Sequence, residues 1–154
     1  MALTTLDIKE PGLNVLPPGV ERYVVEGGGL TGIQVLPDDE IEIINNEGNQ
    51  ICEISVFNKD GKSELGILSL KEIKENSEIK KILFKKDETS LQALLQLKKR
   101  NLNIEKSKSS IIFDKETKAG ESIKLKSKDK CYCIFAAPGI KCLFMNKILR
   151  LSSL

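Results

Sequence analysis

The chain has 154 residues, of which 40% are hydrophobic and 30% charged, and a formal net charge of +2. This length fits one folded domain with its own core, and the composition excludes a disordered chain, a fibrous repeat and a disulfide-rich scaffold. No apolar run approaches the roughly 20 residues of a membrane span. There is no histidine, so any catalysis would depend on Asp, Glu, Cys, Lys or Tyr.

The charges are distributed unevenly along the chain. Residues 1–70 carry four basic and twelve acidic side chains, whereas residues 71–154 carry twenty basic and ten acidic ones. Such a split indicates either an acidic half bound to a basic half or a basic surface for an anionic partner. Because the lysines are scattered and aromatic residues make up 5%, we expect a solvated lysine-rich surface and no nucleic-acid partner.

Short apolar runs separated by turn residues predict antiparallel β-structure in the first half of the chain. Residues 1–22 are typical of an extended lead-in, because prolines and glycines interrupt them. Residues 23–68 are expected to form a first β block, with strands near 23–25, 33–36, 40–43 and 51–57.

The middle of the chain, residues 69–103, is predicted to be a helical insertion, with its helices within about 69–101. Ser69 and Glu72 fit a capping box at the start of a short helix. Residues 87–101 predict the main helix, with Thr89 or Ser90 as its cap. Three leucines (91, 94 and 95) lie on one face of this helix, and three cations (98–100) complement its dipole at the C-terminus.

Residues 109–154 return to the β pattern and form the second β block. Strands are expected near 111–113, 122–126 and 131–137, and the tail from 141 is expected to be a strand or a helix. Because each β block alone offers few strands, we expect them to share one core. The sequence therefore predicts a single, mostly β domain over 1–154, a sandwich or distorted barrel with one helical insertion.

A glycine-rich segment, Gly27-Gly28-Gly29-Leu30-Thr31-Gly32, matches the G-x-G-x-x-G pattern of dinucleotide-binding proteins. That site also needs a helix to begin at the last glycine, because the helix N-terminus holds the pyrophosphate. The residues that follow here are typical of a strand. The segment therefore predicts a hairpin or bulge that requires positive φ. The acidic run 38–42 similarly indicates a turn and a polar strand face rather than a metal loop.

The four cysteines are Cys52, Cys131, Cys133 and Cys142. Without a secretion signal at the N-terminus, we expect a cytoplasmic protein with reduced thiols. Cys131 and Cys133 would point to the same side of a strand, and all four are weak candidates for thiolate ligands. The spacing lacks the paired C-x2-C of common zinc sites, so we expect structural thiols, no bound metal and no cofactor.

The strand near 51–57 carries the one candidate catalytic side chain. In a strand, Glu53 would lie on the same face as Ile51, Ser55 and Phe57. A carboxylate among these residues either lies in a pocket, where its pKa would be perturbed, or lies on a solvated surface. The sequence leaves both alternatives open.

Several of these segments together resemble the urea-carboxylase-associated family. The resemblance is carried by the glycine segment 27–29, by 35–43, by 47–50 with 56–58, and by Cys133-Ile134-Phe135-Ala136-Ala137-Pro138. Gly48 to Glu53 follows the family's G-x-Q-x-x-D stretch, but with Glu in place of Asp, and Ala137 stands where the family often has Cys. Similar domains occur ahead of aminomethyltransferases of the glycine-cleavage T-protein type.

The resemblance implies an accessory or small-ligand-binding domain related to aminomethyltransferases and to amine and one-carbon metabolism, not catalytic by itself. It also implies Gln50, Glu53 and Asn58 as candidate ligand-binding residues, and an aminomethyltransferase-like protein or domain as a candidate partner. The alternatives are a small metal-dependent hydrolase or deiminase with Glu53 as general base, and a structural subunit. Whether the chain forms a homo-oligomer is left open, and no membrane partner is expected.

Overall fold

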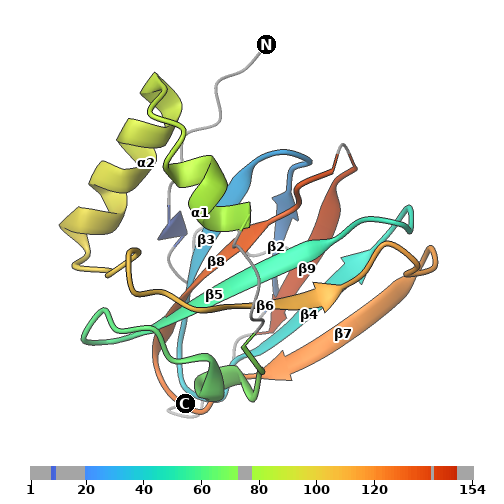
Figure 1. The fold of residues 1–154 in the computed structure, drawn as a ribbon. Coiled ribbons are helices and arrows are strands. Elements are labelled where there is room, and N and C mark those ends of the chain that lie inside the picture. Colours follow the sequence, from blue (N-terminus) through green and yellow to red (C-terminus); the bar gives the residue numbers. More distant parts are fainter. Residues whose placement is uncertain (1–7, 10–19, 73–77, 140, 149–154) are drawn as a thin grey trace.

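The computed structural model describes residues 8–9, 20–72, 78–139 and 141–148, which form two packed β-sheets (Figure 1). One sheet has the strand order β1-β3-β8-β5-β6 and the other β2-β9-β4-β7. The strands are β1 (Ile8–Lys9), β2 (Val20–Val25), β3 (Leu30–Val35), β4 (Glu40–Asn45), β5 (Cys52–Asn58), β6 (Ser109–Phe113), β7 (Glu121–Lys126), β8 (Cys131–Ala136) and β9 (Leu143–Ile148). The short β1 runs parallel to β3, and all the other pairs are antiparallel. The predicted mostly β sandwich is confirmed.

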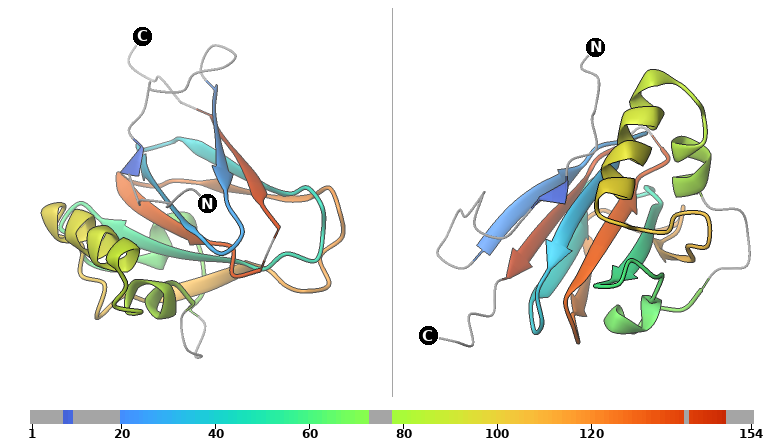
Figure 2. Two further views of the ribbon diagram at one scale, coloured as in Figure 1. Left: turned by 90° about the horizontal axis from the view of Figure 1, so that it is seen from above. Right: turned by 90° about the vertical axis from the view of Figure 1, so that its left-hand side faces the viewer.

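Two helices cover the outer face of the five-stranded sheet (Figure 2). They are α1 (Glu78–Leu83) and α2 (Glu88–Lys99). Ile79, Leu83 and Leu97 of these helices pack against Phe57 and Ile134 of the sheet. The molecule therefore has three layers, in which the central strands β5 and β8 are buried on both faces. In the part of the chain that the structure describes, neither helix has the length and apolar character needed to cross a bilayer.

The core between the sheets draws on both β blocks. Ile43 and Ile54 of the first block and Leu125 and Phe135 of the second belong to one buried cluster. The predicted shared core is confirmed at these positions. Ile134 does not belong to this cluster, because it points to the other side of β8 and packs under the helices. Alternation along the strand explains the difference, because neighbouring residues face opposite sides of a sheet.

The acidic and basic halves of the chain meet on the outer face of the four-stranded sheet. Glu40 lies opposite Lys126, and Glu42 lies opposite Lys124, in the antiparallel register of β4 and β7. These side chains are partly or fully exposed. Cross-strand pairs of opposite charge in such positions contribute only roughly 0.2–1 kcal/mol each. The uneven charge distribution thus reflects strand pairing on a solvated surface at these positions.

The helical insertion differs from the prediction at its start. Ser69 does not begin a helix: it ends a short 3₁₀ helix, Leu65–Leu68, in the left-handed conformation with φ +58°. Residues 70–72 that follow are not helical. The burial of Leu65 and Leu68 in the core accounts for this, because tertiary packing overrides a local capping signal. Residues 73–77, where the predicted helix would continue, lie outside the described part.

Helix α2 is confirmed, but its cap and its buried face differ from the expectation. Asp87, rather than Thr89 or Ser90, is the N-cap, and its carboxylate accepts a hydrogen bond from the Ser90 N–H at 2.7 Å. The buried face consists of Ser90, Ala93 and Leu97. The predicted leucine face therefore points mainly to solvent.

The glycine segment forms the turn between β2 and β3, where the chain crosses from one sheet to the other. Gly28 has φ +79°, and its N–H donates to the Ala137 carbonyl at 2.6 Å. Only glycine adopts this conformation without strain. The predicted positive φ is confirmed, but the segment is not a hairpin, because β2 and β3 belong to different sheets. No helix begins at Gly32, which lies inside β3.

Candidate functional site

Glu53 lies beneath helix α1 rather than in a pocket or on the surface. Its side chain is 1% exposed. One carboxylate oxygen accepts the N–H of Glu78 at 3.1 Å and the other accepts the N–H of Ile79 at 2.6 Å. The Ser109 hydroxyl approaches the first oxygen at 3.4 Å. A carboxylate in this position satisfies the free N–H groups of the helix N-terminus and matches the helix dipole.

This arrangement gives Glu53 a structural role. Both carboxylate oxygens are engaged with backbone donors of α1, so the group that would have to remove a proton from a substrate already holds a helix in place. Ser55, the next residue on the same strand face, is also buried. Neither residue is among the lining residues of the four hollows found beside α2, beside β7 and at the β6–β7 turn.

Gln50 holds the connection between β8 and β9. Its carbonyl oxygen accepts the Lys141 N–H at 3.1 Å, and its side chain packs so closely on Gly139 that a Cβ there would lie 2.5 Å from the oxygen. Its own backbone carbonyl accepts a hydrogen bond from the Asn45 side chain. Gln50 therefore fixes a loop, and its amide is buried.

Asn58 shapes the turn after β5. Its side-chain oxygen accepts the N–H groups of Asp60 and Lys62 at 2.9 and 3.0 Å, which is the usual role of Asn in a tight turn. Asn58 lies five residues beyond Glu53 on an extended strand, a separation of roughly 16 Å at about 3.3 Å per residue. The structure therefore does not bring Gln50, Glu53 and Asn58 together.

The four cysteines are free thiols at separate positions, apart from one pair. The Sγ atoms of Cys131 and Cys133 lie 3.8 Å apart on the inner face of β8. This contact lowers the pKa of Cys131 and raises that of Cys133. Burial raises the pKa of Cys52. Within the described ranges no three Cys, Asp or Glu side chains cluster as metal ligands would.

Thiol reactivity provides a test of this arrangement. Cys52, Cys131 and Cys133 are buried, whereas Cys142 is partly exposed. A chromogenic disulfide reagent should therefore titrate one thiol rapidly in the native protein and four after denaturation without reductant. Rapid reaction of three or four native thiols would contradict the burial of β8, and two thiols in total would indicate a disulfide.

An unexpected group of charged residues lies between the two sheets, at the end where β2, β4 and β9 meet. Lys147, Glu21 and Asp39 are each at most 1% exposed. The Lys147 ammonium lies 3.6 Å from the Asp39 carboxylate and donates to the Gln34 carbonyl at 2.6 Å. The Tyr23 hydroxyl donates to Glu21. Burial lowers the pKa of Lys147, and the two carboxylates oppose this shift.

This buried group stabilises the fold rather than forming a site. Its three charged residues are absent from the linings of the same four hollows. The register pairs Lys147 with Glu21 across β9 and β2, so the opposite charges face each other by strand alternation. The sequence contains no indication of this charged group. Lys147 shares the inward face of β9 with Leu143 and Met145, and an apolar residue is normal at such a position.

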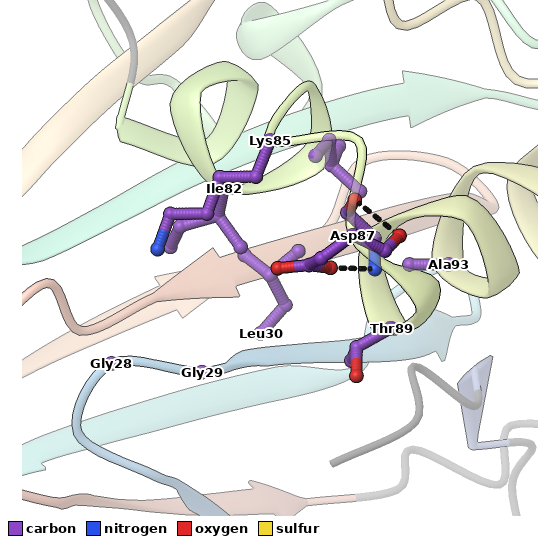
Figure 3. A pocket seen from close by; sticks show the side chains of 10 residues that line it. Gly28, Gly29, Leu30, Ile82, Lys85, Asp87, Thr89 and Ala93 are labelled. Carbon is purple, nitrogen blue, oxygen red and sulfur yellow. Dashed lines mark hydrogen bonds between the residues drawn. The ribbon is translucent and has the colours of Figure 1, made fainter. Parts of the chain in front are cut away.

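A pocket of about 140 Å³ lies where the glycine turn meets the helical insertion (Figure 3). We call it the glycine-turn pocket. Three separate parts of the chain build it: the β2–β3 turn, the end of α1 with the following connection, and the start of α2. Its lining residues are Gly28, Gly29, Leu30, Ile82, Leu83, Lys85, Asp87, Thr89, Ser90 and Ala93.

The glycine-turn pocket combines an apolar wall with one charge of each sign. Leu30, Leu83 and Ala93 are buried and form the wall. In Figure 3 the Asp87 carboxylate extends toward Leu30, and Lys85 runs past Ile82 on the other side. A few polar groups around an apolar hollow are typical of small-molecule sites.

Helix α2 fixes the charge and the position of Asp87. The hydrogen bond from the Ser90 N–H, followed by the contact with the Ser90 side chain, lowers the pKa of Asp87. Its carboxylate is therefore ionised at neutral pH. Gly28 and Gly29 have no side chains, which leaves the opposite side of the pocket open. Sequence reasoning missed this site because its residues lie in segments more than fifty positions apart.

A second hollow of about 410 Å³ lies on the other side of α2. It is lined by the end of α1, the outer part of α2 and the loop that follows, including Phe84, Leu94 and Leu102. All of these belong to the insertion or its exit. The glycine-turn pocket is the candidate ligand site, because there the β2–β3 turn of the sheets and both helices converge.

One similarity to a characterised protein is informative. The chain is 33% identical over 133 residues to the trimethylamine-oxide aldolase of Ruegeria pomeroyi (strain ATCC 700808 / DSM 15171 / DSS-3). The match covers 86% of this chain but only 17% of the aldolase. No protein-family model matches the chain, and no solved structure matches it. The chain is thus related to a segment of an amine-metabolising protein, while the resemblance to the urea-carboxylase-associated family stays a prediction.

Proposed function

We propose that this chain is an accessory domain of amine metabolism that binds a small methylated amine or amine oxide in the glycine-turn pocket, without catalysing its conversion. The observation that carries the proposal is the apolar hollow between Lys85 and the ionised Asp87. The similarity to a segment of trimethylamine-oxide aldolase supports the amine chemistry. In this proposal the whole chain works as one domain.

The chemistry of the pocket suits such a ligand. Trimethylamine N-oxide has a positive nitrogen surrounded by methyl groups and a negative oxygen at one end. Its methyl groups would lie against Leu30 and Ala93, its nitrogen near Asp87 and its oxygen near Lys85. Opposite charges on two sides of an apolar hollow orient a dipolar molecule, which gives specificity more than affinity.

The groups that could act in catalysis favour a non-catalytic role. Glu53, the candidate general base, is buried and hydrogen-bonded to α1. The glycine-turn pocket contains no cysteine and no tyrosine, and of its two charged groups, Lys85 and Asp87, the Asp87 carboxylate is engaged as the N-cap of α2. These two facts favour an accessory role over the small metal-dependent hydrolase or deiminase, and an aminomethyltransferase-like protein or domain remains the proposed partner.

Calorimetric titration with trimethylamine N-oxide tests the proposal. We expect a dissociation constant of roughly millimolar size, because a molecule with so few atoms can gain little binding energy. Asp87→Asn should weaken binding about fivefold, since one charge contact at a surface contributes up to about 1 kcal/mol. Asn caps a helix as well as Asp does, so this variant keeps α2 intact.

The matched control is Asp60→Asn, at an exposed turn outside the pocket, which should bind as the unchanged protein does. Equal dissociation constants for Asp87→Asn and the unchanged protein would show that the ligand does not bind in the glycine-turn pocket. No heat at any accessible concentration, for trimethylamine N-oxide and trimethylammonium alike, would contradict the ligand class.

A further inference from the structure

Helix α2 exposes two leucines on the side that faces away from the sheet. Leu91 and Leu95 are 55% and 54% exposed, the highest values among the large apolar residues of the described part. Single exposed apolar residues are common on protein surfaces. Two of them one helical turn apart form a continuous apolar stripe, which needs a separate explanation.

The residues that flank the two leucines extend the stripe with opposite charges. Glu88 lies one turn before Leu91, and Lys98 lies one turn after Leu95, and both are exposed. The spacing of these four residues is three, four and three, which is the heptad spacing of a helix that packs against another helix. Ser90, Ala93 and Leu97 face the opposite way, into the protein.

This stripe is complementary to itself in one orientation. If two copies of α2 pack antiparallel about a two-fold axis at the level of Ala93, Leu91 of each copy meets Leu95 of the other. The same axis places Glu88 of each copy beside Lys98 of the other. A parallel arrangement would instead place Glu88 beside Glu88 and Lys98 beside Lys98. The charges therefore favour the antiparallel pair, and the opposed helix dipoles favour it too.

We propose that this chain forms a two-fold homodimer through antiparallel packing of α2, with Leu91 and Leu95 at its centre and Glu88–Lys98 pairs at both ends. The occupant of the stripe is a second copy of this chain, because the charges at its two ends match each other. The interface belongs to the smallest size class, so the dimer is weak and forms at high protein concentration. It does not depend on the ligand proposed for the glycine-turn pocket.

Sedimentation equilibrium of the full chain tests the dimer, at concentrations from about 10 µM to about 1 mM and at low salt, where weak interfaces with charged rims are detectable. The unchanged protein should pass from monomer to dimer across this range. Leu91→Gln should raise the dissociation constant at least about tenfold, because the two-fold axis introduces the change twice. Ile111→Gln alters a residue of similar exposure, 44%, on β6, and should leave the dissociation constant unchanged.

Charge reversal distinguishes the antiparallel α2 dimer from non-specific association. Glu88→Lys and Lys98→Glu should each weaken the dimer about tenfold by placing like charges together, and the double variant should restore it to within about threefold. Circular dichroism confirms that each variant keeps its helices. A protein that stays monomeric at every concentration would overturn the proposal and leave the stripe to a different protein. A dimer that ignores these reversals would overturn the antiparallel pairing.

Discussion

Replacement of Lys147 by methionine is expected to lower the free energy of unfolding by about 3–5 kcal/mol. Lys147 is fully buried, and it is the cation that lies 3.6 Å from the buried Asp39 carboxylate. Methionine fills a similar volume but leaves the carboxylates of Asp39 and Glu21 between the sheets without that positive charge. Taking a charge out of water without its partner costs far more than the pair contributes.

Urea denaturation of matched variants measures this effect. Lys124→Met changes an exposed lysine on β7 and should shift the stability by no more than about 0.5 kcal/mol. The double variant Lys147→Met with Asp39→Asn should recover part of the loss, because one of the two buried carboxylates then no longer carries a charge. A loss for Lys147→Met as small as that for Lys124→Met would show that the buried pair does not stabilise the fold.

Glu53→Ala is expected to lower the free energy of unfolding by about 2–3 kcal/mol, because it leaves the N–H groups at the start of α1 buried without their acceptor. Glu53→Gln keeps one carbonyl oxygen in place and should cost about half as much. The loss should be concentrated in α1, which has only six residues and depends on this contact and on Ile79 and Leu83 for its position.

Amide hydrogen exchange locates that loss. In Glu53→Ala, protection should fall first over residues 78–83, while amides of β4 and β9 keep theirs. Ser109→Ala removes the weaker contact at 3.4 Å and should change protection in α1 much less. If Glu53→Ala left the exchange of α1 unchanged, the anchoring role would be wrong, and Glu53 would again be a candidate for chemistry.

The strands were predictable because their signals are local. Along β4 and β7, apolar and polar residues alternate between clear turn residues, and the structure confirms both strands. The glycine turn was predictable for the same reason, since positive φ at Gly28 depends on its immediate neighbours. Alternation and turn chemistry act within a few residues, so a single sequence displays them.

The glycine-turn pocket and the structural roles of Glu53 and Lys147 were not predictable, because they depend on contacts between distant segments. The donors that hold Glu53 belong to a helix 25 residues further along the chain, and the partner of Lys147 lies in a turn more than a hundred residues before it. A leucine face on a helix normally indicates burial, but in α2 the small residue Ala93 makes the close contact and Leu91 stays exposed. Each of these outcomes depends on tertiary packing, which local sequence patterns do not show.

Amide chemical-shift mapping during titration with trimethylamine N-oxide tests whether a small amine-type ligand binds between the glycine turn and the helical insertion. We expect saturable shifts clustered at residues 28–30 and 82–93, which line the pocket, with the amides around Gln50 and Asn58 unmoved. Shifts centred on Gln50 or on Asn58 at the end of β5, or uniform shifts that do not saturate, would contradict binding in this pocket.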